Sequence, residues 1–266
     1  MITQNNQDIK VLQYENLSYC DIFHFITTRN GGVSRGNYAS FNISPYSGDN
    51  PEHILQNQKF FSEYLKAELV LPYQTHQDKI LRIDDSWNVR TPEDKSGLLH
   101  GIDALITASA GICIGVSTAD CVPVLLYDPV RKVVGAVHAG WRGTVCRIVS
   151  KTISEMIVHY GSDPSDIYAG IGPSISQEKF EVGEEVVEAF EQAGYDIPKL
   201  TLRNPHTGKA HIDLWAANTD DLLLAGVPAS HIQVAGICSV RNADQFFSAR
   251  TLGIKSGRTV SGIMLR

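Results

Sequence analysis

Residues 121–138 read CVPVLLYDPVRKVVGAVH. Two apolar runs flank the segment DPVR, in which Pro129 stands where tight turns favour proline, so the stretch predicts a β-hairpin. If the chain turns between Pro129 and Val130, Cys121 lies directly opposite His138. Directly opposed side chains have Cβ atoms about 4.5–5.5 Å apart, close enough for a thiol and an imidazole to hold one ion or exchange a proton. A register shift of one residue would turn one of the two side chains to the other face.

Strand patterns and a few helices surround this hairpin. Pro51, followed by apolar residues at helical spacing, predicts a helix of about four turns, and an apolar stripe from Thr144 predicts a helix that ends at Gly161. The other predicted helices are 183–193 and 213–224, and the predicted strands are 19–27, 69–75, 79–83, 102–107, 112–117, 122–127, 132–137, 166–171, 232–237 and 259–265. Clustered strands without regular alternation with helices favour an α+β fold. Because no repeat or linker appears, residues 1–266 are predicted to form a single domain.

The composition limits the classes of function. The 266 residues are 43% hydrophobic, which is enough to fill a substantial core. A formal net charge of −6, with no block of Lys and Arg, argues against binding to nucleic acid. The polar N-terminus lacks a secretory pattern and the apolar stretch 104–116 is too short to span a membrane, so we expect a cytoplasmic protein. Five cysteines at scattered spacings do not indicate a disulfide framework.

A third candidate ligand is His76, within the polar quartet QTHQ at residues 74–77. A single histidine in a polar loop is more often a surface residue than a metal ligand. Together with Cys121 and His138, however, it completes a Cys-His-His set. This set suits zinc and leaves a fourth position open for water or substrate. The other histidines lack such a grouping and are interpreted as structural or exposed.

Residues that could bind an anion accompany these three candidate ligands in the sequence. Two glycines and Arg142 follow His138 at the predicted start of the helix, whose free N–H groups and dipole favour phosphate or carboxylate. Arg29, beside two glycines, is a second candidate clamp. The alternative is that the glycines only form a tight turn and that each arginine is a solvated surface charge. Asp120 is either a general base, a partner of an imidazole, or the cap of a loop.

Several blocks together resemble one family, the multicopper-polyphenol-oxidase or laccase-domain family. The blocks are TRNGGVS (28–34), QTH (74–76), TADCVPV (118–124), HAGWRGT (138–144), GPSI (172–175), FEVG (180–183), DLW (213–215), FFS (246–248) and GR (257–258). The resemblance implies a layered α/β/β/α fold with mixed sheets, similar to the catalytic domain of cytotoxic necrotizing factor toxins. It also implies zinc, with copper as the alternative, on His76, Cys121 and His138.

The activities that the resemblance implies are diverse. They include phosphorolysis of adenosine, inosine, guanosine and methylthioadenosine, together with adenosine deamination. An older name implies copper-dependent phenol oxidation, and another implies editing of peptidoglycan precursors. Glu178 and Lys179 stand where the family often has a cysteine, and Thr251 stands where it often has a second arginine, so the resemblance does not fix the substrate details. A segment resembling the family's Ser-Leu-Asn makes Asn42 a candidate substrate contact.

The leading hypothesis is a zinc-dependent enzyme whose partners are a purine nucleoside and phosphate. Zinc would activate water for attack at C6, while Arg29, Arg142 and the helix N-terminus would hold phosphate. A second hypothesis uses Cys121 as nucleophile and His138 as base in hydrolysis of a muropeptide-like amide, without metal. Multicopper oxidation would need many more histidine ligands. A closed structural zinc site would need a fourth ligand from Cys113 or Asp120. The sequence leaves the oligomeric state open.

Overall fold

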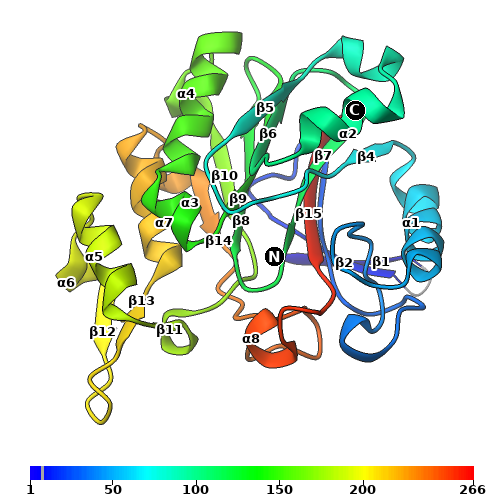
Figure 1. The fold of residues 1–266 in the computed structure, drawn as a ribbon. Helices are drawn as coiled ribbons and strands as arrows, with labels where there is room; N and C mark the ends of the chain where they lie inside the picture. Colours follow the sequence, from blue (N-terminus) through cyan, green and yellow to red (C-terminus); the bar gives the residue numbers. More distant parts are fainter. Residues whose placement is uncertain (7–8) are drawn as a thin grey trace.

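The computed structural model describes residues 1–6 and 9–266 and contains two six-stranded mixed sheets packed face to face (Figure 1). The first sheet has the order β1 (Ile2–Asn6), β2 (Ile9–Gln13), β3 (Ile22–Thr27), β15 (Thr259–Leu265), β7 (Ile112–Thr118) and β4 (Glu68–Val70). The second has the order β14 (Ile232–Val234), β10 (Tyr168–Ile171), β8 (Val122–Asp128), β9 (Val133–Ala139), β6 (Ala104–Thr107) and β5 (Ile80–Ile83). A small third sheet consists of β11 (Glu181–Val182), β13 (Ala210–Ile212) and β12 (Thr201–Arg203).

Helices cover the outer faces of the two large sheets (Figure 1). Helix α1 (Pro51–Leu65) lies on the first sheet, while α3 (Trp141–Val145), α4 (Ile148–Tyr160) and α7 (Leu214–Leu224) lie on the second. The remaining helices are α2 (Pro92–Leu99), α5 (Glu184–Gln192), α6 (Ile197–Leu200) and α8 (Ala249–Leu252). The layers are therefore helix, sheet, sheet and helix, and the expected α+β class with mixed sheets is confirmed. In the described part of the chain, no helix is long and apolar enough to cross a membrane.

Three apolar clusters hold these layers together. Leu125 and Val134 of the second sheet face Ile114 and Ile263 of the first, which forms the central core. A second cluster joins α4 and α7 to the outer face of the second sheet. The third places Phe61 of α1 against the outer face of the first sheet. Burial of this apolar surface is the main stabilising term, at about 25 cal/mol per Å².

The β8–β9 hairpin forms as expected, but its register differs from the predicted one. Pro123, and not Cys121, lies opposite His138, and Asp128 pairs with Val133. Cys121 therefore lies just before β8 and is diagonal to His138. The expectation of direct opposition was wrong by two residues along one strand, a shift that leaves both side chains on the same face.

The cause of the shifted register is the turn itself. The Asp128 carboxylate accepts hydrogen bonds from the backbone N–H groups of Val130 (2.8 Å) and Arg131 (2.9 Å). Lys132 then takes a left-handed conformation with φ 54°. An Asp side chain that bonds the backbone two and three residues ahead stabilises a longer turn. The loop consequently has its centre one peptide later than the proline alone suggested.

Further expectations were wrong in detail, and the strand predicted over 232–237 ends at Val234. The helix predicted from Thr144 is divided into α3 and α4, because Arg147 adopts φ 59° between them. The Arg147 guanidinium bonds the buried Asp221 carboxylate and the Ala193 carbonyl, which ties this break to neighbouring helices. The predicted end at Gly161 is correct, with φ 68°. The strand predicted over 69–75 ends at Val70.

Candidate metal centre

Three ligand-bearing segments meet where the chain crosses between the two large sheets. His76 lies in the connection from β4 to β5, Cys121 lies in the connection from β7 to β8, and His138 lies near the end of β9. One ligand atom from each lies within 4.8 Å of the other two, and the two imidazole centroids are 4.9 Å apart. Within the residues that the structure describes, this is the one group of three or more such side chains that could hold a metal ion.

Asp103, which the sequence analysis did not single out, links two of these segments. Its carboxylate is fully buried and lies 2.7 Å from His138 Nδ1. It also accepts the backbone N–H groups of Thr75 (3.2 Å), His76 (3.0 Å) and Gln77 (2.9 Å). Nδ1 of His138 is thus occupied, which leaves Nε2 to face the other two ligands.

Without a bound metal, the electrostatics of the site favour a Cys121 thiolate beside a His138 imidazolium. Burial acts to raise the pKa of the Cys121 thiol, but the charge of His138 and hydrogen bonds from His138 and His76 lower it to about 6. Burial acts to lower the pKa of His138, but the Cys121 charge and the bond to Asp103 raise it to about 9. The same negative charges would attract a metal cation.

These three side chains open into a pocket of about 630 Å³, within the usual range for small-molecule sites. Aromatic surfaces come from Tyr46, Tyr73 and Trp141. Positive charges come from Arg142, Arg250 and Arg258, and the pocket lining contains a single acid, Asp120. An overall acidic protein thus has a basic pocket, which suits an anionic group.

Asp120 lines this pocket but both of its carboxylate oxygens have partners. Oδ1 accepts from Ser239 Oγ at 2.6 Å and Oδ2 accepts from the backbone N–H of Arg250 at 2.7 Å. The residue has φ 87°, and its carbonyl accepts the N–H of Ile175 at 2.9 Å. This arrangement fastens the loop that carries Arg250 next to Cys121.

Arg142 lies in the pocket lining, where its guanidinium stacks over the Trp141 ring at 4.2 Å from the centroid. Because α3 has only five residues, the long helix that the sequence analysis placed behind Arg142 does not begin there.

Arg29 and Asn42 lie outside the pocket lining. The Arg29 guanidinium donates to the carbonyls of Ala39 (2.7 Å) and Ala243 (2.6 Å) and lies over the Phe247 ring. Asn42 is buried, and its Oδ1 accepts the backbone N–H of Arg258 at 3.1 Å. Both side chains therefore support the loops around the pocket. Arg250 and Arg258, to which the sequence analysis gave no role, supply charge directly.

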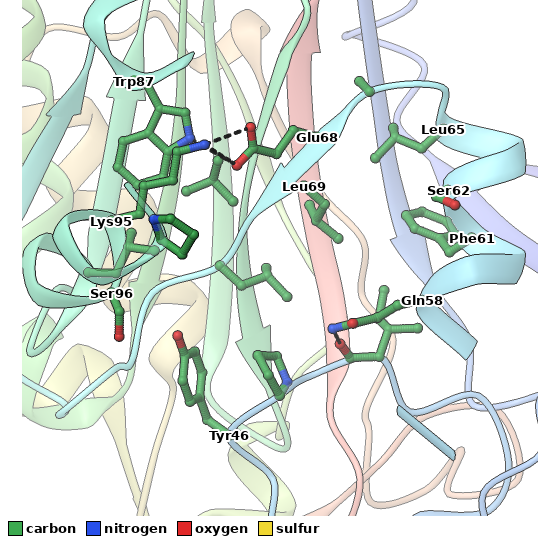
Figure 2. Close-up of a pocket in the computed structure, with 17 residues that line it drawn as sticks. Tyr46, Gln58, Phe61, Ser62, Leu65, Glu68, Leu69, Trp87, Lys95 and Ser96 are labelled. Carbon is green, nitrogen blue, oxygen red and sulfur yellow. Dashed lines mark hydrogen bonds and ion pairs between the residues drawn. The ribbon is translucent and has the colours of Figure 1, made fainter. Parts of the chain in front are cut away.

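A second pocket of about 480 Å³ lies between α1 and α2 (Figure 2). Figure 2 shows Phe61, Leu65 and Leu69 along its apolar wall. Its charged groups are satisfied by one another, since Trp87 Nε1 and Lys95 Nζ both donate to Glu68. It contains none of the candidate ligands.

Residues 23–266 match the family described as multi-copper polyphenol oxidoreductase laccase. The chain belongs to this laccase family. A relative from Bacteroides thetaiotaomicron named purine nucleoside phosphorylase is 51% identical over 97% of both chains. One named adenosine deaminase RL5, from an unknown prokaryotic organism, is 45% identical over 90% of this chain and 92% of its own.

Two solved structures have the same fold. Bacillus licheniformis YfiH has a TM-score of 0.89 at 30% identity and covers 99% of both chains. YlmD from Geobacillus stearothermophilus has the same TM-score and identity and covers 99% of this chain and 98% of its own.

Proposed function

We propose that this chain is a metal-dependent purine nucleoside enzyme in which zinc is held by His76, Cys121 and His138. The observation that carries the proposal is the approach of these three ligand atoms to within 4.8 Å at a basic pocket. The printed names of two relatives, purine nucleoside phosphorylase and adenosine deaminase, support this class of substrate.

The donor set fits zinc. Two imidazole nitrogens and a thiolate suit a borderline-soft cation, and three protein ligands are typical of a catalytic site with one open position. Cys113, a candidate fourth ligand, lies in the core cluster on the outer face of the first sheet, and Asp120 is bonded elsewhere. Copper is the alternative metal for the same ligands. When bound, zinc supplies Lewis acidity that makes water a nucleophile near neutral pH.

The remaining pocket residues bind and orient the substrate. The guanidinium groups of Arg142 and Arg250 hold phosphate or a ribose phosphate product through charge-assisted hydrogen bonds. The Arg258 guanidinium, which donates to the carbonyls of Ile254, Ser256 and Gly257, adds positive charge beside them. Tyr46 and Tyr73 present aromatic surfaces against which a purine ring can stack. Asp120 keeps Arg250 next to Cys121 through the backbone bond at 2.7 Å.

A second candidate function is amide hydrolysis, with a peptidoglycan precursor as substrate. The observation that favours it is the lowered pKa of Cys121 next to His138, a pairing found in cysteine hydrolases. In that reaction the thiolate attacks the carbonyl carbon and His138 gives a proton to the leaving amine. Metal content and substrate preference separate the two functions.

The test is to purify the protein without added metal, to quantify bound metals, and to incubate adenosine with phosphate. Chromatography then measures adenine, hypoxanthine, inosine and ribose phosphate. Near-stoichiometric zinc and nucleoside products that are lost in Cys121→Ala would support the proposal. Cys146→Ala, which removes an exposed thiol outside the pocket, should change neither result. A metal-free protein inert to nucleosides would favour the hydrolase.

A further inference from the structure

We infer that Asp103 is the positioning residue that orients both histidine ligands at once. This inference rests on the proposed metal site. Asp103 lies immediately before β6, with no exposed surface, and belongs to neither ligand-bearing segment. A buried carboxylate is costly unless hydrogen bonds satisfy it, and here every bond that satisfies it involves a segment carrying a ligand.

The Asp103 carboxylate orients His138 through a bond to its ring. The carboxylate Oδ1 accepts the Nδ1–H of the imidazole at 2.7 Å, which selects the tautomer with a free lone pair on Nε2. Backbone bonds hold the two residues in place, since His138 donates its N–H to the Asp103 carbonyl at 2.8 Å. Asp103 in turn donates its N–H to the Lys79 carbonyl at 2.9 Å. These backbone bonds hold Asp103 and His138 side by side, so the ring can turn away only by breaking its 2.7 Å bond to the carboxylate.

The Asp103 carboxylate orients His76 through bonds to the backbone. Three successive N–H groups, from Thr75 to Gln77, converge on the same carboxylate. His76 has φ 61°, a left-handed conformation that is unfavourable for a residue with a Cβ atom. Because the His76 side chain is exposed, surrounding packing does little to fix it. The anion at the centre of these three donors stabilises the turn that directs His76 towards Cys121.

An asparagine at position 103 could not accept hydrogen bonds both from the His138 ring and from the backbone N–H groups of the His76 turn. Its amide has one acceptor oxygen, and its NH₂ group would face either the Nδ1–H of His138 or the N–H groups of the His76 turn. Donor would then meet donor in a buried site. Loss of such a partner of a metal-ligating histidine typically weakens metal binding 10–100-fold, so we expect a loss of about that size for Asp103→Asn.

The test compares metal binding by the wild type, Asp103→Asn and Asp128→Asn. Asp128 is an equally buried aspartate that accepts two backbone N–H groups, but it lies at the far end of β8. Metal-free proteins are titrated with zinc against a chromophoric chelator and with Co²⁺, whose visible spectrum reports ligand geometry. We expect weaker binding and an altered Co²⁺ spectrum for Asp103→Asn only. Asp128→Asn should change neither readout, because both backbone N–H groups donate to Oδ1, an acceptor that asparagine retains.

A measurement on the wild type covers the case in which Asp103→Asn does not fold. Long-range ¹H–¹⁵N spectra of the zinc-loaded protein should show His138 with a hydrogen-bonded proton on Nδ1 and metal on Nε2. Metal on Nδ1, or zinc affinity in Asp103→Asn within threefold of wild type, would overturn the inference but leave the proposed function standing. A wild-type protein without affinity for zinc would overturn both.

Discussion

Replacement of Gly140 by alanine should weaken zinc binding without damage to the fold. A Cβ atom at this position would lie 3.1 Å from Cys121 Sγ and 3.5 Å from His76 Cδ2. Relief of the first contact requires a movement of at least a few tenths of an ångström, since non-bonded heavy atoms prefer a separation of about 3.5–4 Å. Metal ligands tolerate only about 0.2 Å. The backbone itself accepts alanine, because Gly140 has φ −64° and ψ 166°.

The free-energy cost of the added methyl group should fall on the zinc-bound protein and not on the metal-free protein. In the metal-free protein the Cys121 side chain can move away from the new methyl group, whereas a bound ion holds the sulfur in place. Overpacking costs about 1–3 kcal/mol, which corresponds to a rise in the zinc dissociation constant of about fivefold to about 150-fold. Competition with a chromophoric chelator measures this change.

A matched control is Gly97→Ala. This glycine lies in α2, where a Cβ atom would meet nothing within 4 Å, so the change should raise stability by about 1 kcal/mol and leave zinc affinity unchanged. If Gly140→Ala binds zinc as tightly as the wild type, the ligand atoms are not as closely confined as the distances indicate.

Two other predictions concern phosphate and pH. Arg142→Met should raise the KM for phosphate about tenfold, because it removes one charge-assisted hydrogen bond, and should leave the melting temperature unchanged. Initial rates at varied phosphate concentrations measure the KM. An unchanged KM would show that Arg142 does not bind phosphate. Burial lowers the pKa of His24 to about 4, and its Nε2 accepts the N–H of Tyr14 at 2.8 Å. The unfolded chain takes up this proton below about pH 6.5, so stability should fall by roughly 2 kcal/mol between pH 7 and pH 5. Urea titrations should show that loss in the wild type and a smaller one in His24→Gln.

The sequence was most informative where chemistry and local pattern coincide. Cys121 and His138 bracket one hairpin, so their proximity could be predicted although the register was wrong. The error was harmless because a shift of two residues preserves the face of a strand, whereas a shift of one would have separated the pair. His76 could be added only through its residue type and the family resemblance.

Features that depend on contacts between distant segments could not be predicted. Asp103 meets His138 across two paired strands, and the only local signal was an acid within an apolar run, which needs partners if it is buried. Arg258 reaches the pocket because Asn42 holds its backbone, a contact between opposite ends of the chain. The edge strand Ile2–Asn6 was missed because its sequence, ITQNN, has a single apolar residue and so shows no strand pattern.

The place of β15 in the first sheet has a consequence for synthesis. Gly262 lies between Phe25 of β3 and Gly115 of β7, so a strand that is translated long after both of its neighbours is an interior one. At roughly 5–20 residues per second, its neighbours emerge from the ribosome many seconds earlier and expose unpaired edges until it arrives. The sheet therefore stays incomplete until β15 has been made, and such distant pairing is slow. We expect nascent chains to engage holding chaperones, and chains truncated before residue 259 to aggregate or be degraded.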